Sequence, residues 1–184
     1  KESSDEQSTG VTVAIASKAV RNQIVNAALE TAVKSNPSPL FSKKALSKIT
    51  TGNFEDNMPD IASCDWVIEV VVERLDIKKV IYDQVEKFRK AGTLVTSNTS
   101  GIPIHLMAED RSEDFKAHFC GSHFFNPPRY LRLLEIIPTP QTKPEVVDFL
   151  MHYGDKFLGK TTVLCKDTAA FIANRVGVYS MMAL

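Results

Sequence analysis

The chain has 184 residues, of which 43% are hydrophobic and 24% are charged, the ordinary proportions of a globular protein. Its 22 Lys and Arg residues balance 22 Asp and Glu residues, which argues against a nucleic-acid binder because a phosphate-neutralising surface normally gives a basic excess. No apolar run approaches the length of a membrane span, and the acidic, polar start of the chain does not resemble a secretory signal.

The first part of the chain predicts helices. Apolar residues recur at helical spacing over residues 13–35, and Asn36-Pro37 ends the pattern because the residue before a proline is pushed out of the helical region. We expect a shorter helix at 40–48 and a short extended piece at 49–51. Residues 10–17 are apolar enough to form a strand, but no glycine-rich turn follows them.

The rest of the chain alternates between strands and helices. We expect strands at 65–72, 93–97, 119–125, 131–137 and 161–165, and helices at 75–90, 102–109, 142–158 and 168–184. Thr142 and Glu145 form a capping box at the start of the third of these helices. The alternation predicts an α/β fold with a mostly parallel sheet covered on both faces. The connection through Pro127 and Pro128 is too short for a parallel crossover, so the strand at 131–137 should run antiparallel to the one before it.

A polar segment, Ser97-Asn98-Thr99-Ser100-Gly101, directly follows the strand at 93–97. Ligands of open α/β sheets bind beyond the carboxyl ends of the strands, so these hydroxyl and amide groups are candidates for a substrate or cofactor site. The alternative is a capped turn, which favours Ser and Asn and is the better interpretation of this segment alone.

His123 and Glu135 should face each other across the two antiparallel strands. A regular hairpin centred on Arg129 pairs them, with Cβ atoms about 4.5–5.5 Å apart. A carboxylate beside an imidazole fixes the ring and stabilises its protonated form, as a general base near neutral pH requires. The alternative is a structural contact on a solvated face, but Glu135 lies in an apolar strand where an ionisable residue needs a partner. We therefore favour a functional pair.

Glu69 lies within the apolar strand at 65–72, Glu73 follows that strand, and Lys78 comes about one helical turn later. At the end of the strand, the Glu73 carboxylate could meet a ligand hydroxyl, and Lys78 could reach an anion. A solvated helix start is the alternative that the residues alone favour for Glu73 and Lys78.

Neither the histidines nor the cysteines predict a metal site. His105, His118 and His152 have no neighbouring ligand-type residues at metal spacing. Small buried hydrophobes in a reducing cytoplasm explain the cysteines better than a disulfide framework. Their number is odd, and no CxxC pair occurs among Cys64, Cys120 and Cys165.

Four segments occur in a fixed order: VIEVVVERLDIKK (67–79), SNTSGIPI (97–104), GSHFFNPPRYLRLLEIIPTPQT (121–142) and CKDTAAFIANR (165–175). Together they resemble the NAD-binding domain of the 3-hydroxyacyl-CoA dehydrogenases of fatty-acid β-oxidation. The resemblance implies a Rossmann-type fold, NAD as the cofactor, an acyl-CoA substrate, and reversible oxidation of an L-3-hydroxyacyl-CoA to the 3-ketoacyl-CoA.

The resemblance also implies roles for individual residues. The family's catalytic His and Glu fall on His123 and Glu135, and two further site residues, which would hold substrate oxygens, fall on Ser100 and Asn174. Lys34 is a loose match to a lysine that binds the CoA part of the substrate, and a solvated residue in the last turn of a helix is the better alternative. The residues implied to contact NAD are Glu73, Lys78, Asn98, Ser100 and Asn126.

The chain departs from the family at both ends. The family's glycine-rich turn, which holds the pyrophosphate, has no counterpart because no G-x-G occurs in this sequence. We therefore expect a truncated NAD-binding domain with a partial doubly wound sheet at residues 1–172, and the beginning of a C-terminal helical domain at 173–184. Absence of the first two strands would expose the edge of the strand at 65–72. We expect a homo-oligomer formed through the segment from Val67 to Val72, or an N-terminal segment rearranged over that edge.

Two other functions stay open on the sequence alone. One is a non-catalytic module that binds a nucleotide or an acyl-CoA on the same scaffold, and the other is an inert structural fragment. The complete set of Ser100, His123, Glu135 and Asn174 speaks against the first. The absent glycine-rich turn supports the second for this chain, though not for its parent enzyme.

Overall fold

The structure, a computed structural model, describes residues 17–183. The strand expected at 10–17, apart from its last residue, and the first residues of the helix expected at 13–35 lie outside the described residues. The chain divides into two compact units, Lys1–Pro59 and Asp60–Leu184. All candidate site residues except Lys34 belong to the second unit.

The first unit contains short helices where one long helix was expected. α2 (Lys18–Arg21) and α3 (Gln23–Lys34) are separated at Asn22, which ends the first helix and begins the second. The side-chain oxygen of Asn22 accepts a hydrogen bond from Asn53 Nδ2 at 2.6 Å, and such contacts outside the helix favour Asn at helix ends. The helix expected at 40–48 is the shorter 3-10 helix η1 (Lys43–Lys48).

The second unit is built on a five-stranded sheet in the order β1-β2-β3-β4-β5. The pairs β1–β2, β2–β3 and β4–β5 are parallel, and β3–β4 is antiparallel, which confirms the predicted fold class. β1 is shorter than expected because the Val71 N–H donates to Glu69 Oε1 at 2.6 Å instead of continuing the ladder. The 3-10 helix η2 (Met58–Ser63) precedes the strands, which are β1 (Trp66–Glu69), β2 (Leu94–Ser97), β3 (Phe119–Phe124), β4 (Leu133–Pro138) and β5 (Thr161–Leu164).

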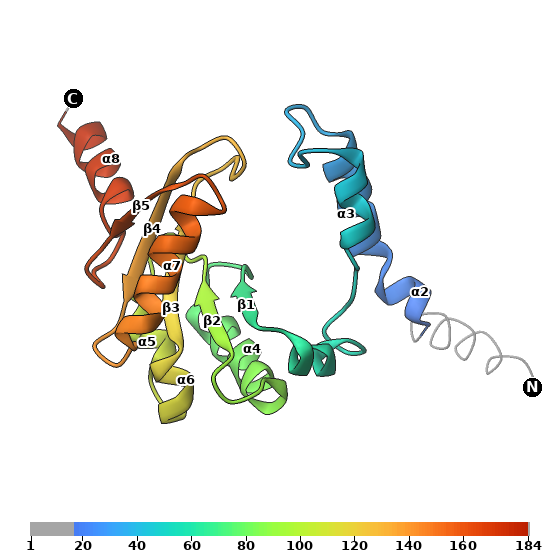
Figure 1. The fold of residues 1–184 in the computed structure, drawn as a ribbon, viewed down its shortest axis with the longest axis horizontal. Helices are drawn as coiled ribbons and strands as arrows, with labels where there is room; N and C mark the ends of the chain where they lie inside the picture. The colour runs from blue at the N-terminus through green and yellow to red at the C-terminus, as the bar shows by residue number, and fades with distance from the viewer. Residues whose placement is uncertain (1–16, 184) are drawn as a thin grey trace, which may run out of the picture. The chain divides into compact units, whose positions relative to one another are not determined.

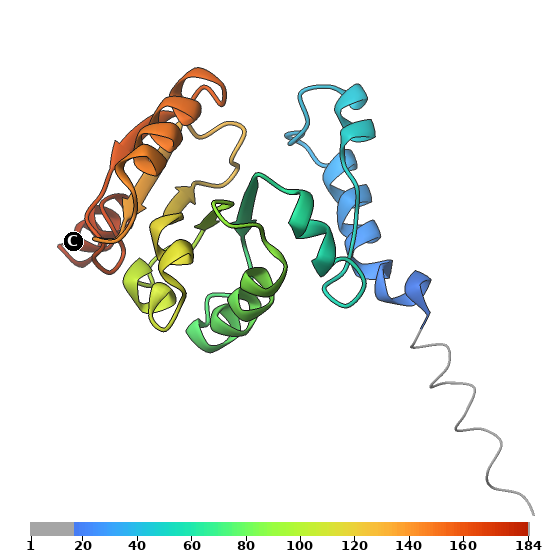
Figure 2. The same ribbon diagram turned by 60° about the horizontal axis from the view of Figure 1, so that its bottom comes forward.

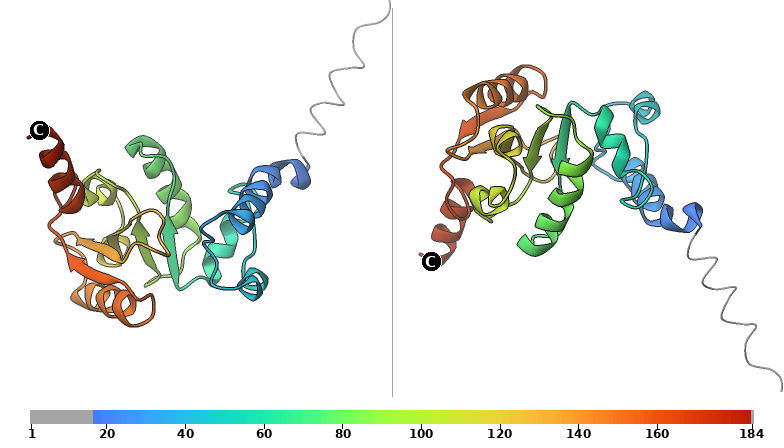
Figure 3. Two further views of the ribbon diagram at one scale, coloured as in Figure 1. Left: turned by 90° about the horizontal axis from the view of Figure 1, so that it is seen from above. Right: turned by 90° about the horizontal axis from the view of Figure 1, so that it is seen from below.

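Helices cover both faces of this sheet. α4 (Leu75–Phe88), α5 (Ile104–Ala108) and α6 (Glu113–Ala117) lie on one face, and α7 (Pro144–Lys156) lies on the other (Figures 1 and 2). The left view of Figure 3 shows the sheet between α4 and α7. None of the described helices is both long and apolar enough to span a membrane.

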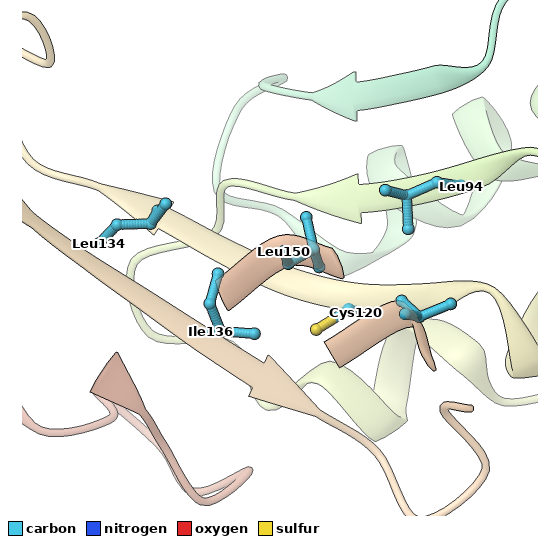
Figure 4. Close-up of a cluster of buried hydrophobic side chains, with 6 residues drawn as sticks. Leu94, Cys120, Leu134, Ile136 and Leu150 are labelled. Atoms are coloured by element: carbon cyan, nitrogen blue, oxygen red, sulfur yellow. The ribbon is translucent and has the colours of Figure 1, made fainter. Parts of the chain in front are cut away.

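One hydrophobic core fills the space between the sheet and α7. Side chains from β2, β3 and β4 pack against Leu150 of α7 (Figure 4). Leu94, Cys120, Leu134 and Ile136 supply the strand side of this cluster. Since successive side chains of a strand point to opposite faces, Gly121, His123 and Glu135 lie on the other face of the sheet.

On that other face, α5 approaches the sheet closely beside the candidate site. A Cβ atom on Gly121 would lie 2.7 Å from Ile104 Cδ1 and 3.0 Å from Ile137 Cβ, so this position accommodates only glycine without movement of its neighbours. Next to it, Tyr82, Phe115 and Phe119 form a buried aromatic cluster with ring centroids 4.9–5.5 Å apart.

The last two helices begin later than expected. The capping box predicted at Thr142 is wrong, because Thr142 Oγ1 donates to the Phe119 carbonyl oxygen at 2.6 Å, and Lys143 is the N-cap of α7. α8 (Ala173–Met182) is preceded by a turn in which Ala170 and Phe171 have φ values of 60° and 44°. This left-handed conformation interrupts the helix expected from residue 168.

Candidate active site

His123 and Glu135 form the predicted pair. They are direct partners in the β3–β4 register, and His123 Nδ1 lies 2.8 Å from Glu135 Oε2. Their side chains are only 5% and 1% exposed, so the alternative of a contact on a solvated face is wrong. Two rings flank the imidazole, with the Phe125 centroid at 4.4 Å and the Phe171 centroid at 5.9 Å.

The second oxygen of Glu135 binds the start of α8, which the sequence analysis missed. Glu135 Oε1 accepts hydrogen bonds from the backbone N–H groups of Ile172 at 3.0 Å and Ala173 at 2.9 Å. Both donors lie at the positive end of the α8 helix dipole, where a carboxylate is a favourable partner. An ionised carboxylate only accepts hydrogen bonds, so His123 Nδ1 carries the proton. With the proton on Nδ1, Nε2 is the nitrogen that can accept another proton, and it makes no hydrogen bond to the described residues.

Glu73 organises the segment after β2. Its Oε1 atom accepts hydrogen bonds from Thr99 Oγ1 at 2.5 Å, from the Ser100 N–H at 2.9 Å and from the Gly101 N–H at 3.1 Å. Partial burial raises the pKa of Glu73, but these three hydrogen bonds and the nearby Lys78 charge outweigh it, and the net pKa is lowered. The segment is a capped turn, as the alternative interpretation held, but the cap is a carboxylate at the end of a neighbouring strand.

The structure brings Ser100 and Asn174 together. Asn174 Nδ2 donates to the Ser100 carbonyl oxygen at 2.9 Å, although 74 positions separate the two residues. Asn98 Oδ1 accepts a hydrogen bond from the Phe124 N–H at 2.9 Å and so joins the end of β2 to the end of β3. Asn126 lies two positions after the end of β3 and is exposed.

The burial of Lys78 differs from what the sequence predicted. Its side chain is fully buried, so the solvated helix start expected for it is wrong. Nζ lies 2.9 Å from Glu69 Oε1 and 3.5 Å from Glu73 Oε2, which leaves the ammonium enclosed between two carboxylates and out of reach of an external anion in this structure. The sequence did carry a signal for this pair, because Glu69 is an ionisable residue inside an apolar strand.

Asp167 is a second residue that the sequence analysis missed. Its carboxylate accepts hydrogen bonds from the N–H groups of Ile104 at 2.6 Å and His105 at 2.8 Å, at the start of α5. His105 Nδ1 lies 2.7 Å from Asp167 Oδ2. This contact fixes the segment that leads from β5 to α8 against the helix beside Gly121.

Lys34 lies in the last turn of α3 in the first unit, with its side chain 77% exposed and 3.6 Å from Glu30. Its expected contact with the CoA part of a substrate stays a prediction. Among residues 17–183, no group of three His, Cys, Asp or Glu side chains is arranged to hold a metal ion.

Comparison with known proteins identifies the family. The family model described as "3-hydroxyacyl-CoA dehydrogenase, NAD binding domain" matches residues 7–168. The chain belongs to this family. The chain is 51% identical over 166 residues to a probable 3-hydroxyacyl-CoA dehydrogenase of Bacillus subtilis strain 168, covering 90% of this chain and 21% of that protein.

A second relative of this chain is a putative fatty acid oxidation complex trifunctional enzyme of Rickettsia felis, 42% identical over 158 residues, covering 86% of this chain and 22% of that protein. The chain therefore spans about a fifth of the length of both relatives. Among solved structures, the crystal structure of FadB2 from M. tuberculosis matches with a TM-score of 0.72 and 29% sequence identity, covering 90% of this chain and 56% of that one.

The carboxyl ends of β1, β2 and β3 fit the hydroxyl- and amide-bearing part of NAD, the cofactor of the dehydrogenase family. The Glu73 side chain remains 44% exposed despite its hydrogen bonds to the segment after β2. Ser100 and Asn126 are exposed, and Asn98 is half-buried. These groups supply both hydrogen-bond donors and acceptors at one edge, beside His123. The sequence contains no G-x-G turn of the kind that cradles a pyrophosphate.

Proposed function

We propose that this chain provides the NAD-binding domain and the catalytic His–Glu pair of an enzyme that oxidises L-3-hydroxyacyl-CoA to 3-ketoacyl-CoA. The observation that carries the proposal is the buried 2.8 Å contact of His123 Nδ1 with Glu135, which leaves Nε2 without a partner among the described residues. Family membership and the polar edge formed by Glu73, Asn98 and Ser100 support it.

The residues of the chain act on the proton and on the orientation of the substrate. His123 Nε2 takes the proton of the substrate's 3-hydroxyl group, and the imidazolium that forms is stabilised by Glu135. Ser100 and Asn174 hold substrate oxygens beside the ring. NAD, when bound, supplies the acceptor for the hydride that leaves C3. The residues that would hold NAD are Glu73, Asn98, Ser100 and Asn126, with Lys78 acting through its contact with Glu73.

The setting of the reaction is a second part of the proposal. We place it in fatty-acid β-oxidation, which the printed name of the Rickettsia relative supports. We place the protein in the cytoplasm, because the three cysteines are free and so suit a reducing compartment. We also keep the boundary between an NAD-binding domain at 1–172 and a helical domain from 173, since α8 begins at Ala173.

The third part of the proposal is that the protein forms a homo-oligomer. β1 is the end strand of the described sheet, and three apolar side chains from Val67 to Val72 are exposed: Ile68 by 43%, Val70 by 67% and Val72 by 59%. Such an edge pairs readily with another chain. Sedimentation should show a dimer or larger species, and replacing Val70 with Lys should shift it toward monomer. A monomeric wild-type protein would contradict this part.

The decisive experiment for the activity is His123→Ala in the full-length protein. Turnover of a 3-hydroxyacyl-CoA with NAD should fall about 10²–10⁴-fold, the usual contribution of a general base. His152→Ala is the matched control, because His152 is exposed on α7 on the other face of the sheet. Turnover of His123→Ala within threefold of wild type would refute the assignment, and wild-type protein that binds NADH and acyl-CoA without turnover would favour a non-catalytic module.

A further inference from the structure

The Glu69 carboxylate is the centre of a buried polar network beneath the candidate site. The Glu69 side chain is 1% exposed, yet it lies at the end of β1, four positions before Glu73. It accepts hydrogen bonds from groups on α4, β2 and the segment after β1: Lys78 Nζ at 2.9 and 3.0 Å, Tyr82 Oη at 2.8 Å, Ser97 Oγ at 2.7 Å and the Val71 N–H at 2.6 Å. One carboxylate thus joins α4 and the end of β2 to the segment after β1, which leads to Glu73.

Two contacts connect this network to the site. Ser97 Oγ accepts a hydrogen bond from the Thr99 N–H at 3.2 Å, which fixes the start of the segment after β2. Lys78 Nζ lies 3.5 Å from Glu73 Oε2 but only 2.9 Å from Glu69. Because Glu73 Oε1 is occupied by Thr99, Ser100 and Gly101, Oε2 is the oxygen that remains for a ligand.

We propose that Glu69 is a positioning residue for NAD binding, which rests on the proposed function. It holds the Lys78 ammonium back from Glu73 Oε2, so that this oxygen can accept a hydrogen bond from a ligand hydroxyl. Through Ser97 it also fixes the segment that carries Ser100. Without the Glu69 charge, Lys78 has Glu73 as its only carboxylate, and the buried ammonium moves onto Oε2 and competes with the ligand.

The test is Glu69→Gln in the full-length protein, which keeps the shape of the side chain and removes its charge. We expect the Kd for NADH and the KM for NAD to rise about tenfold, the effect of one charge-assisted hydrogen bond, with kcat and the KM for acyl-CoA within twofold. Asp83→Asn is the matched control on α4, because Asp83 is 59% exposed and pairs with Arg111 away from the site. Unchanged NADH affinity overturns the proposal. A joint loss in kcat, both KM values and thermal stability also overturns it, because that pattern is a general structural defect.

A second measurement separates this proposal from the proposed function. Amide hydrogen exchange of Ser100 and Gly101, measured without any ligand, should accelerate about tenfold in Glu69→Gln and stay unchanged in Asp83→Asn, because Glu73 is drawn away from their N–H groups. Wild-type protein that does not bind NADH would refute the proposed function, while unchanged exchange would overturn the role of Glu69. Should Glu69→Gln not fold, Ser97→Ala removes the link between Glu69 and the Thr99 N–H, and it should raise the Kd for NADH two- to threefold and accelerate the exchange of the Thr99 amide. An unchanged Kd for NADH with unchanged Thr99 exchange would overturn the proposal.

Discussion

Replacing Glu135 with Gln tests how the His123–Glu135 pair is held. The carboxylate of Glu135 accepts three hydrogen bonds, from His123 on one oxygen and from the N–H groups of Ile172 and Ala173 on the other. A glutamine offers one oxygen and one NH₂ group in the same space, so it cannot serve both sides as an acceptor.

The glutamine amide can adopt two orientations, and each has a different predicted cost. If the glutamine oxygen stays on the two N–H groups of α8, its NH₂ faces His123 Nδ1, which must then lose its proton and accept. The proton moves to Nε2, and the nitrogen that takes the substrate proton is no longer basic. A wrong tautomer of this kind costs up to about 10⁴-fold in turnover. If the amide flips, its NH₂ meets the N–H groups of α8, and the start of that helix loses about 1–3 kcal/mol of hydrogen bonding.

The assay is kcat of Glu135→Gln in the full-length protein, with the ring tautomer of His123 read by ¹⁵N NMR. We expect kcat to fall by at least 10²-fold. If the glutamine oxygen stays on α8, the proton of His123 should shift to Nε2. If the amide flips, the amide exchange of Ala173 should increase instead. Turnover within threefold of wild type, with an unchanged tautomer, would refute the reasoning.

Three further predictions concern groups around the pair. The pKa of Glu73 is lowered from its ordinary value of 4.5. The stability that its ionised form contributes is therefore fully present above pH 4.5 and is lost as the pH falls through the lower pKa of the folded state. In urea unfolding measured at several pH values, the difference in unfolding free energy between wild type and Glu73→Gln should shrink below about pH 4.5. Burial raises the pKa of the Cys120 thiol to about 12, so exposed Cys64 should react with a thiol reagent at pH 8 well before Cys120 does, and equal rates would contradict the structure. Gly121→Ala should lower the free energy of unfolding by about 1–3 kcal/mol, because the added Cβ would lie 2.7 Å from Ile104 Cδ1. An unchanged melting temperature would contradict this and show that α5 moves to make room for the methyl group.

Local sequence patterns were sufficient to predict the sheet and the pairing of His123 with Glu135. Apolar runs of β-branched residues predict buried strands, and the short Pro127-Pro128 connection permits only an antiparallel return. Because side chains in a strand have a period of two, one register places His123 opposite Glu135, and the observed ladder has this register. Only local chain geometry entered this prediction.

Contacts between distant segments were beyond the reach of these patterns. The Glu73 side chain caps residues 26 to 28 positions away, and Asp167 caps a helix 62 to 63 positions earlier in the chain. No periodicity encodes such contacts, because they depend on how elements pack. Lys78 shows the same limit: a lysine early in a helix is ordinarily solvated, and here the buried Glu69 overrides that preference.

The turn before α8 explains why the Glu135 carboxylate is shared between His123 and the start of α8. Ala170 and Phe171 both adopt left-handed backbone conformations, which cost energy for residues with a Cβ atom. This turn aims the N–H groups of Ile172 and Ala173 at Glu135 and places the Phe171 ring against His123. Its cost is offset by the contacts with His123 and Glu135, so the attachment of α8 and the orientation of the imidazole depend on the same carboxylate. Any movement of α8 that withdraws its two N–H groups would therefore reach His123 through a single side chain.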